Sequence, residues 1–220
     1  ANEFKIPCIG GKVSLYNETP SGPIKPTPLI GVLGLIDKKP LVSQKIQSGD
    51  NLVIIGDTKD ELGGSEYFEY IHKFIGGNCP TVDFKESKKN MKSVLDSIKQ
   101  QIPKSVHDCS KGGLAVAVAE LCMTNQIGCK VSLNKVPGEK LTDDRILFSE
   151  SHSRYLLTID EKNIKKLENI LKKNKVTFQI IGKFGGKKIH FANGTKSIIT
   201  LDVDKAQKTW LNSLKNLVLS

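Results

Sequence analysis

The stretch Ser105–Met123, SVHDCSKGGLAVAVAELCM, contains the pattern that most constrains the fold of this chain. A short run ending near Asp108 leads into Gly112-Gly113, and Glu120 is the only charged residue of the apolar segment that follows. A helix that is apolar on all sides has to be surrounded by other elements. The pattern therefore predicts a buried helix at the centre of a domain. The glycine-bearing turn before it would direct backbone N–H groups at one point, where the start of a helix favours an anion.

The length and composition are those of a globular protein. With 220 residues the chain can form one large domain, or one domain and part of another. Hydrophobic residues make up 38% and charged residues 25% of the sequence, which is ordinary for a soluble protein. No apolar run approaches the roughly 18 residues of a membrane span, and the opening ANEFKIPCIGGK contains no signal-peptide core. We therefore expect a cytoplasmic protein without a membrane partner.

The net charge of +10 raises the question of nucleic-acid binding. Arg145 and Arg154 are the only arginines, although arginine is the usual residue for forked contacts to phosphates and bases. The lysines alternate with acidic residues, as in EKNIKKLENILKKNK at 161–175, which is typical of a solvated helix face. We therefore expect no nucleic-acid partner.

The five cysteines form no C-x-x-C pair, and the four histidines show no zinc-ligand spacing. We interpret the cysteines as reduced thiols that mostly serve packing.

The first 46 residues are expected to be extended. Ile9, Val13 and Leu15 suggest a strand. The prolines between residues 20 and 28 exclude a helix there, and the apolar LIGVLGLI at 29–36 predicts a second strand. Two strands without a helix of their own look like the tail of a domain whose body lies upstream.

The remaining residues predict alternating strands and helices. The apolar run 52–55 between turn residues is typical of a buried central strand, and Gly76-Gly77 should end a helix at 67–74. Further helices are expected at 84–101, 161–173 and 204–216, and further strands at 105–109, 127–133, 155–159, 176–183, 187–191 and 197–201. Crossovers between strands and helices followed by a late strand meander indicate an α+β, or mixed α/β, domain.

Three loops carry residues that could bind a ligand or take part in catalysis. In Glu61–Glu66, the residues Gly63, Gly64 and Ser65 could bind phosphate at the start of a helix. No Walker A pattern exists in the chain, and a tight turn in which Ser65 caps the helix is the favoured interpretation.

The second and third loops are equally open to a structural explanation. Asp108 could hold a magnesium ion, but capping of the following helix is favoured there. A nucleophilic pair of Cys109 and His107 is a poor alternative, because neighbouring strand residues point to opposite faces. The polar run 149–154 could line a pocket, and a solvated turn is favoured.

Five motifs, in this order, resemble the PurL family of phosphoribosylformylglycinamidine synthases: GGKVSLYNET (10–19), PTPLIGVLGLI (26–36), TKDELGGSEYF (58–68), HDCSKGGLAVAVAE (107–120) and LFSESHSRY (147–155). The resemblance extends to about residue 185 and places the chain in the superfamily of aminoimidazole ribonucleotide synthetase. It implies a PurM C-terminal-domain-like fold, preceded by the tail strands of a PurM N-terminal-like domain. Residues 1–46 would end the second N-type, ATP-binding domain, and residues 47–220 would form the second C-type domain.

The resemblance implies an ATP-dependent ligase of purine biosynthesis, which uses ATP and Mg²⁺ to convert formylglycinamide ribonucleotide and glutamine-derived ammonia to formylglycinamidine ribonucleotide. The partners would be the N-terminal remainder of the polypeptide, a glutaminase subunit and a small PurS-type subunit. Because the family's catalytic histidines lie in the first N-type domain, this chain is expected to be inactive alone. Two alternatives stay open: a structural or nucleotide-binding module without catalysis, and another ATP-dependent member of the superfamily, such as aminoimidazole ribonucleotide synthetase.

The resemblance also assigns roles to residues near the start of the chain. Gly11 and Lys12 would contact the nucleotide and Ser14 the substrate. Lys12 stands where the family has an asparagine that touches magnesium. Either its ammonium group takes the place of the cation against phosphate, or that metal contact is lost.

The later motifs would form an auxiliary site that holds ADP or ATP. Asp108 is the counterpart of a magnesium-binding aspartate in the first half of the family's duplicated chain. Glu150, Ser151 and His152 parallel a substrate-binding stretch of that half. Gly63, Gly64 and Ser65 parallel its glycine loop near phosphate.

Overall fold

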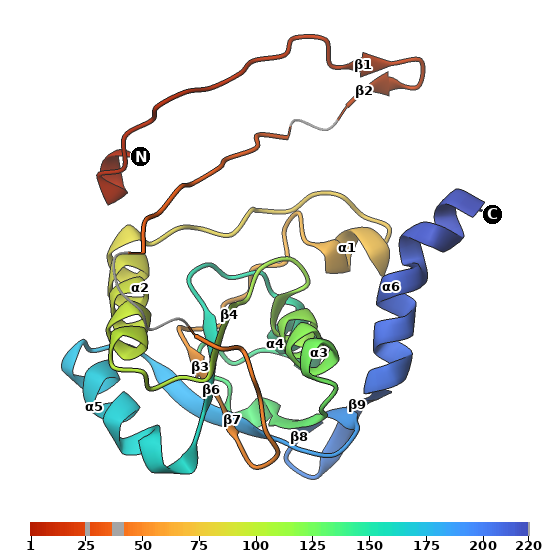
Figure 1. Ribbon diagram of the computed structural model, residues 1–220. Coiled ribbons are helices and arrows are strands. Elements are labelled where there is room, and N and C mark those ends of the chain that lie inside the picture. The colour runs from red at the N-terminus through yellow and green to blue at the C-terminus, as the bar shows by residue number, and fades with distance from the viewer. Residues whose placement is uncertain (25–26, 37–41, 220) are drawn as a thin grey trace. The chain divides into compact units, whose positions relative to one another are not determined.

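The computed structural model describes residues 1–24, 27–36 and 42–219, and contacts divide the chain into two units, residues 1–39 and 40–220. The N-terminal unit contains a 3₁₀ turn, η1 (Asn2–Phe4), and one antiparallel pair, β1 (Glu18–Thr19) with β2 (Gly22–Pro23). The C-terminal unit carries the fold (Figure 1).

The strands expected at 9–15 and 29–36 do not form within the described residues. Their apolar side chains are exposed instead, Leu15 by 88% and Leu29 by 98%. A strand is stable only beside a partner that takes up its backbone hydrogen bonds, and neither segment pairs with any described strand. Residues 25 and 26 of the expected extended stretch 20–28 lie outside the described residues.

The C-terminal unit is built on a mixed sheet whose described strands follow the order β4-β6-β3-β7-β5-β8-β9. Neighbours run antiparallel except for β5 and β8, which are parallel. The strands are β3 (Asn51–Ile55), β4 (Ser105–Asp108), β5 (Cys129–Ser132), β6 (Tyr155–Ile159), β7 (Phe178–Phe184), β8 (Lys188–Asn193) and β9 (Lys196–Asp202).

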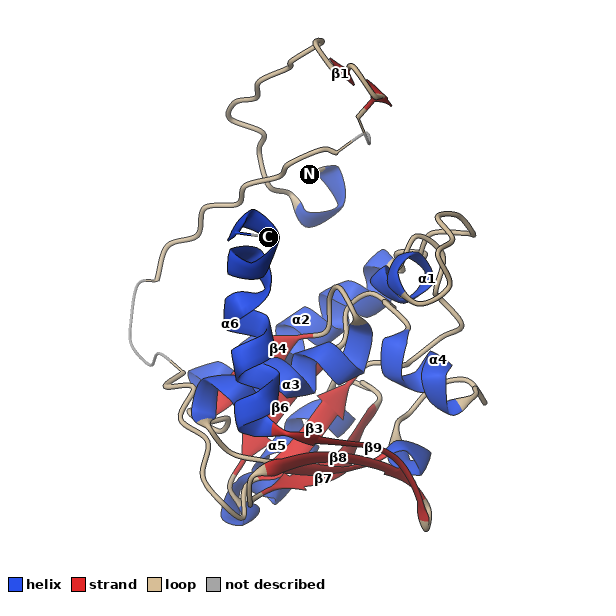
Figure 2. Cartoon of the chain, turned by 90° about the vertical axis from the view of Figure 1, so that its right-hand side faces the viewer, coloured by secondary structure: helices blue, strands red, loops and turns tan. Residues whose placement is uncertain are grey.

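Helices cover both faces of this sheet. The described helices are α1 (Glu66–Tyr70), α2 (Phe84–Lys99), α3 (Gly113–Asn125), α4 (Asp143–Phe148), α5 (Ile164–Lys173) and α6 (Val203–Leu219), with 3₁₀ turns η2 (Leu133–Lys135) and η3 (Glu161–Asn163). Figures 1 and 2 show α2 and α5 on one face and α3, α4 and α6 on the other. Among the helices that the structure describes, none combines the length and the apolar character that a bilayer crossing requires.

Two hydrophobic clusters explain why β3 is buried along its whole length. Leu52 and Ile54 point into the larger cluster, which includes α3, whereas Val53 and Ile55 point into the smaller one beneath α2 and α5. This alternation follows from the two-residue period of a strand. Because helices cover both faces of the sheet, a continuous apolar run is the expected sequence for its central strand.

Most predicted elements are confirmed, and the α+β class with them. The helix predicted after the Ser105–Asp108 strand is α3, in which Leu114 and Val118 are fully buried. The helix expected at 67–74 is shorter than predicted, because α1 ends at Tyr70 and Lys73 adopts a left-handed conformation. Helix α4 was not predicted, since its six residues are too few for a periodic pattern.

Candidate functional site

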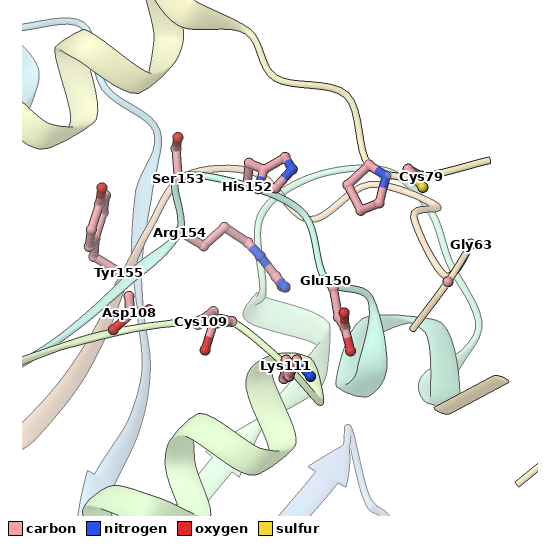
Figure 3. A pocket seen from close by; sticks show the side chains of 13 residues that line it. Gly63, Cys79, Asp108, Cys109, Lys111, Glu150, His152, Ser153, Arg154 and Tyr155 are labelled. Atoms are coloured by element: carbon pink, nitrogen blue, oxygen red, sulfur yellow. The ribbon is translucent and has the colours of Figure 1, made fainter. Parts of the chain in front are cut away.

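Three loops of the C-terminal unit meet at one cavity of about 440 Å³ (Figure 3). The sheet register explains why they meet. Asp108, the last residue of β4, pairs with Tyr155, the first residue of β6, and Ile55, the last residue of β3, pairs with Tyr155 from the other side. The loop after β3, the turn after β4 and the segment before β6 therefore leave the sheet at the same edge.

Glu150 ties these loops together. Its carboxylate oxygen Oε1 accepts hydrogen bonds from the backbone N–H of Gly112, at 2.8 Å, and from that of Glu66, at 3.1 Å. Its own backbone N–H donates to the Glu61 carbonyl at 3.0 Å. The expected anion position at the start of α3 is thus taken by a side chain of the protein itself, and the cap does not come from the polar residues of the turn.

Arg154 holds the backbone on either side of Glu150, and sequence reasoning gave it no role. Its guanidinium group is almost completely buried. It donates to the carbonyls of Ser149 and Ser151, the latter at 3.1 Å, and to the Thr58 hydroxyl at 3.0 Å. Burial lowers the pKa of Arg154, and the nearby acidic groups, including Glu61 and Glu150, oppose this shift. Figure 3 shows the guanidinium group extending toward Glu150.

The other candidate residues of these loops fall into two groups. Gly63, Gly64 and His152 line the cavity. Ser65 is buried and caps α1, since its hydroxyl accepts from the Phe68 N–H at 3.3 Å, which confirms the capping interpretation. Ser151 is also buried, and its hydroxyl accepts from the Lys59 N–H at 3.0 Å.

Glycine is required at position 63 by close packing. A Cβ atom there would collide with the backbone of Asn78. The close approach holds the 76–80 segment against the loop, and Cys79 and Pro80 of that segment form one wall of the cavity. The polar run before β6 is likewise more than a solvated turn, because Glu150 and His152 contribute to this cavity.

Asp108 offers one exposed carboxylate at the cavity. Magnesium commonly takes one or two carboxylates together with water and phosphate oxygens, so Asp108 can supply one ligand, and the others would come from water and a bound phosphate. Within residues 1–24, 27–36 and 42–219, no group of three or more His, Cys, Asp or Glu side chains is arranged to hold a metal ion.

The pair of Cys109 and His107 is not an activated nucleophile. Burial raises the pKa of the Cys109 thiol to about 11, and the Arg154 charge only partly opposes this. Both ring nitrogens of His107 have other partners: Nδ1 lies 2.6 Å from the Asp108 carbonyl oxygen, and Nε2 lies 3.3 Å from Glu120. A neutral thiol without a base beside it has little nucleophilic character.

Gly11, Lys12 and Ser14 belong to the N-terminal unit and are exposed. They lie in a segment without regular secondary structure, and nothing approaches the Cβ position of Gly11 within 4 Å.

The C-terminal unit corresponds to a known class of domain. Residues 47–193 match the family described as AIR synthase related protein, C-terminal domain, and the chain belongs to this family.

Within that class, the chain is similar to curated PurL subunits. The chain is 39% identical over 226 residues to phosphoribosylformylglycinamidine synthase subunit PurL of Methanocaldococcus jannaschii and 36% identical over 220 residues to that of Thermococcus sibiricus. Each alignment covers 99% of this chain and 30% of the relative, so the chain spans less than a third of their length. The structure of Thermotoga maritima PurL complexed with FGAR has the same fold, with a TM-score of 0.69 at 18% identity over 75% of this chain and 29% of that one.

Proposed function

We propose that this chain is the C-terminal part of a PurL-type ligase. In this proposal residues 1–46 end the second N-type domain and residues 47–220 form the second C-type domain. The observation that carries the proposal is the convergence of three of the five family-like motifs, 58–68, 107–120 and 147–155, at one cavity. The alignment of nearly the whole chain with PurL subunits supports it.

The reaction would be the ATP-dependent conversion of formylglycinamide ribonucleotide and glutamine-derived ammonia to formylglycinamidine ribonucleotide. Thermotoga maritima PurL has been solved in complexes with ATP and with ADP, which supports a nucleotide as ligand. Gly11 and Lys12 would contact the nucleotide, Ser14 the substrate and Asp108 a magnesium ion. In such a step the protein acts mainly by holding the reactants in position and stabilising charge.

The exposed apolar residues of the N-terminal unit support a larger polypeptide. Leu29, Ile30, Leu33 and Leu35 are each exposed by more than 80%, and contiguous apolar surface of this kind marks an interface. We propose that upstream residues of the same polypeptide pair with this segment and bury it.

The further partners would be a glutaminase subunit and a small PurS-type subunit, in the cytoplasm. The structure of PurLQS from Thermotoga maritima supports an assembly of this kind.

The proposal is tested in the full-length polypeptide encoded by the complete reading frame, assayed with ATP, Mg²⁺, formylglycinamide ribonucleotide and ammonia. Ser14→Ala should lower kcat/KM for the ribonucleotide at least tenfold, which corresponds to about 1.4 kcal/mol of transition-state stabilisation. Ser21→Ala is the matched control, because Ser21 is also exposed and lies outside the motif.

An unchanged kcat/KM in Ser14→Ala would contradict the assigned role of Ser14. Absence of ligase activity in the intact wild-type polypeptide would contradict the proposed function itself, and would favour a structural or nucleotide-binding module or another ATP-dependent enzyme of the superfamily.

A further inference from the structure

The start of α3 has the features of an anion site, but its backbone N–H donor is already hydrogen-bonded to a side chain of the protein. Gly112 is the N-cap residue of this 13-residue helix and has no capping side chain of its own within the turn. Its N–H donates to Glu150 Oε1 at 2.8 Å, and a second backbone N–H, that of Glu66, donates to the same oxygen at 3.1 Å. Two backbone donors that converge on one oxygen at a helix start are the contacts by which proteins bind phosphate.

The backbone on either side of Glu150 is fixed by its neighbours. The Arg154 guanidinium binds the carbonyls of the residues before and after Glu150, Ser149 and Ser151. The hydroxyls of these two serines accept backbone N–H groups of the loop before α1, from Glu61 at 3.4 Å and from Lys59 at 3.0 Å. Both serines and Arg154 are buried, so the backbone that carries Glu150 is held in place, and the carboxylate itself is held by its two bonds from the Gly112 and Glu66 N–H groups.

We infer that Glu150 is a built-in anion that fills the phosphate position of this cavity and determines its specificity. A phosphate that approached the start of α3 would meet a fixed negative charge, and the two N–H groups would have no free hydrogen to offer. A ligand of this cavity therefore places its phosphates elsewhere. Lys111, which lines the cavity and pairs with Glu66 at 3.2 Å, is an exposed cation nearby. The inference concerns the same cavity as the proposed nucleotide site, but it does not depend on ligase activity.

The inference is tested by creating the empty anion site. Glu150→Ala removes the carboxylate and leaves both N–H groups free. We expect millimolar inorganic phosphate or formate to raise the Tm of this variant in a saturable manner, by several degrees more than for the wild type. Glu120→Ala, which removes one negative charge farther along α3, is the matched control and should respond as the wild type does. Chloride at equal ionic strength separates site binding from general salt effects.

The result that would overturn the inference is a Glu150→Ala variant that folds but gains no more stability from phosphate or formate than the control. Because this readout requires no substrate, its failure would leave the ligase proposal standing. A failed ligase assay, conversely, would leave this result unchanged.

If Glu150→Ala does not fold, the wild-type chain provides a second test by NMR. Millimolar inorganic phosphate should leave the amide resonances of Gly112 and Glu66 where chloride at equal ionic strength leaves them, because Glu150 already engages both N–H groups. A saturable shift of both amides with phosphate would overturn the inference.

Discussion

Gly113 begins α3 where no side chain fits. Its φ of 64° lies in the left-handed region, and an added Cβ would meet the Ser149 carbonyl oxygen at 2.5 Å and the Leu147 carbonyl oxygen at 2.9 Å. Gly186 has nearly the same φ, 66°, with nothing within 4 Å. The two positions therefore separate backbone strain from steric overlap.

We expect Gly113→Ala to lower the free energy of unfolding by about 3 kcal/mol, since a conformational cost of about 1 kcal/mol adds to a steric cost of 1–3 kcal/mol. Gly186→Ala should lower the free energy of unfolding by only about 1 kcal/mol. Urea unfolding with unchanged m-values measures both. Equal losses would mean that the approach of the Ser149 segment to α3 is looser than the structure has it.

Lys104 joins two acidic residues at the ends of strands, Asp50 just before β3 and Asp160 just after β6. Its ammonium group lies 2.8 Å from Asp50, 2.7 Å from Asp160 and 2.9 Å from the Gln47 side-chain oxygen. The hydrogen bond from Lys104 lowers the pKa of Asp160. Burial lowers the pKa of Lys104, but its hydrogen bonds to Asp160 and Asp50 outweigh burial, so that the net shift is upward.

These shifts give a pH dependence of defined sign. Because the pKa of Asp160 is lower in the folded state, the unfolded chain binds more protons as the pH falls below about 4, and stability is lost there. Lys104→Met should lower the free energy of unfolding by about 2 kcal/mol at neutral pH, less than the loss typical of a fully buried pair. The variant should also show a smaller decrease in this free energy than the wild type when the pH falls from about 5 to 3.

Lys162→Met is the matched control for this pH dependence. Lys162 lies 3.9 Å from the same Asp160, with its side chain 80% exposed, so this variant should keep most of the wild-type acid response. Urea unfolding across the pH range compares the three proteins. A Lys104→Met variant with the wild-type slope would contradict the assignment.

At the scale of elements, strand β5 places Lys130 directly opposite Lys183 of β7 and His190 of β8. Lys130 and Lys183 are both exposed, and like charges opposite each other destabilise a sheet. Lys188 of β8 differs, because its cross-strand partner on β9 is Asp202. Two lysines of neighbouring strands thus have opposite electrostatic surroundings.

We expect Lys130→Thr to raise the free energy of unfolding by about 0.5 kcal/mol, from the lost repulsion and the higher strand preference of threonine. Lys188→Thr loses the attraction to Asp202, so its free energy of unfolding should rise less than that of Lys130→Thr, or should fall. The difference between the variants should shrink in 0.5 M salt, since salt screens exposed charges. A difference that persists at high salt would point to strand propensity alone.

The predictability of each element follows from its length and surroundings. The periodic pattern of α2 and the apolar run of α3 were sufficient to predict both helices, and β6 was predicted with its observed bounds, 155–159. The helix at α1 was predicted but not its early end, and the six-residue α4 was not predicted. Both short helices are held by contacts such as the stacking of Tyr67 on Phe148 at 4.7 Å. Contacts between residues this far apart leave no local pattern to detect.

At the scale of the whole molecule, the segment 29–36 is the clearest sign that the two units differ. Leu29 and Leu35 are exposed by 98% and 89%, whereas β3, equally apolar, is buried throughout. We expect the amides of 29–36 to exchange with deuterium at nearly the unprotected rate in this 220-residue chain, and to become protected when native upstream residues are present. The amides of 51–55 are the internal control and should be protected in both. Unprotected 29–36 amides in the longer polypeptide would contradict the proposed pairing.

The sequence by itself determined the α+β class, the buried helix at the centre and the family, because these depend on local periodicity and on motifs that remain readable in a linear chain. It also marked the three loops of the cavity. Only the tertiary structure decided what their residues do. Glu150 occupies the anion position of a helix that begins 37 residues earlier in the chain, and Arg154 is committed to the backbone carbonyls on either side of Glu150. The physical reason is that hydrogen-bond donors and acceptors are assigned by proximity in the folded chain, which sequence spacing does not specify.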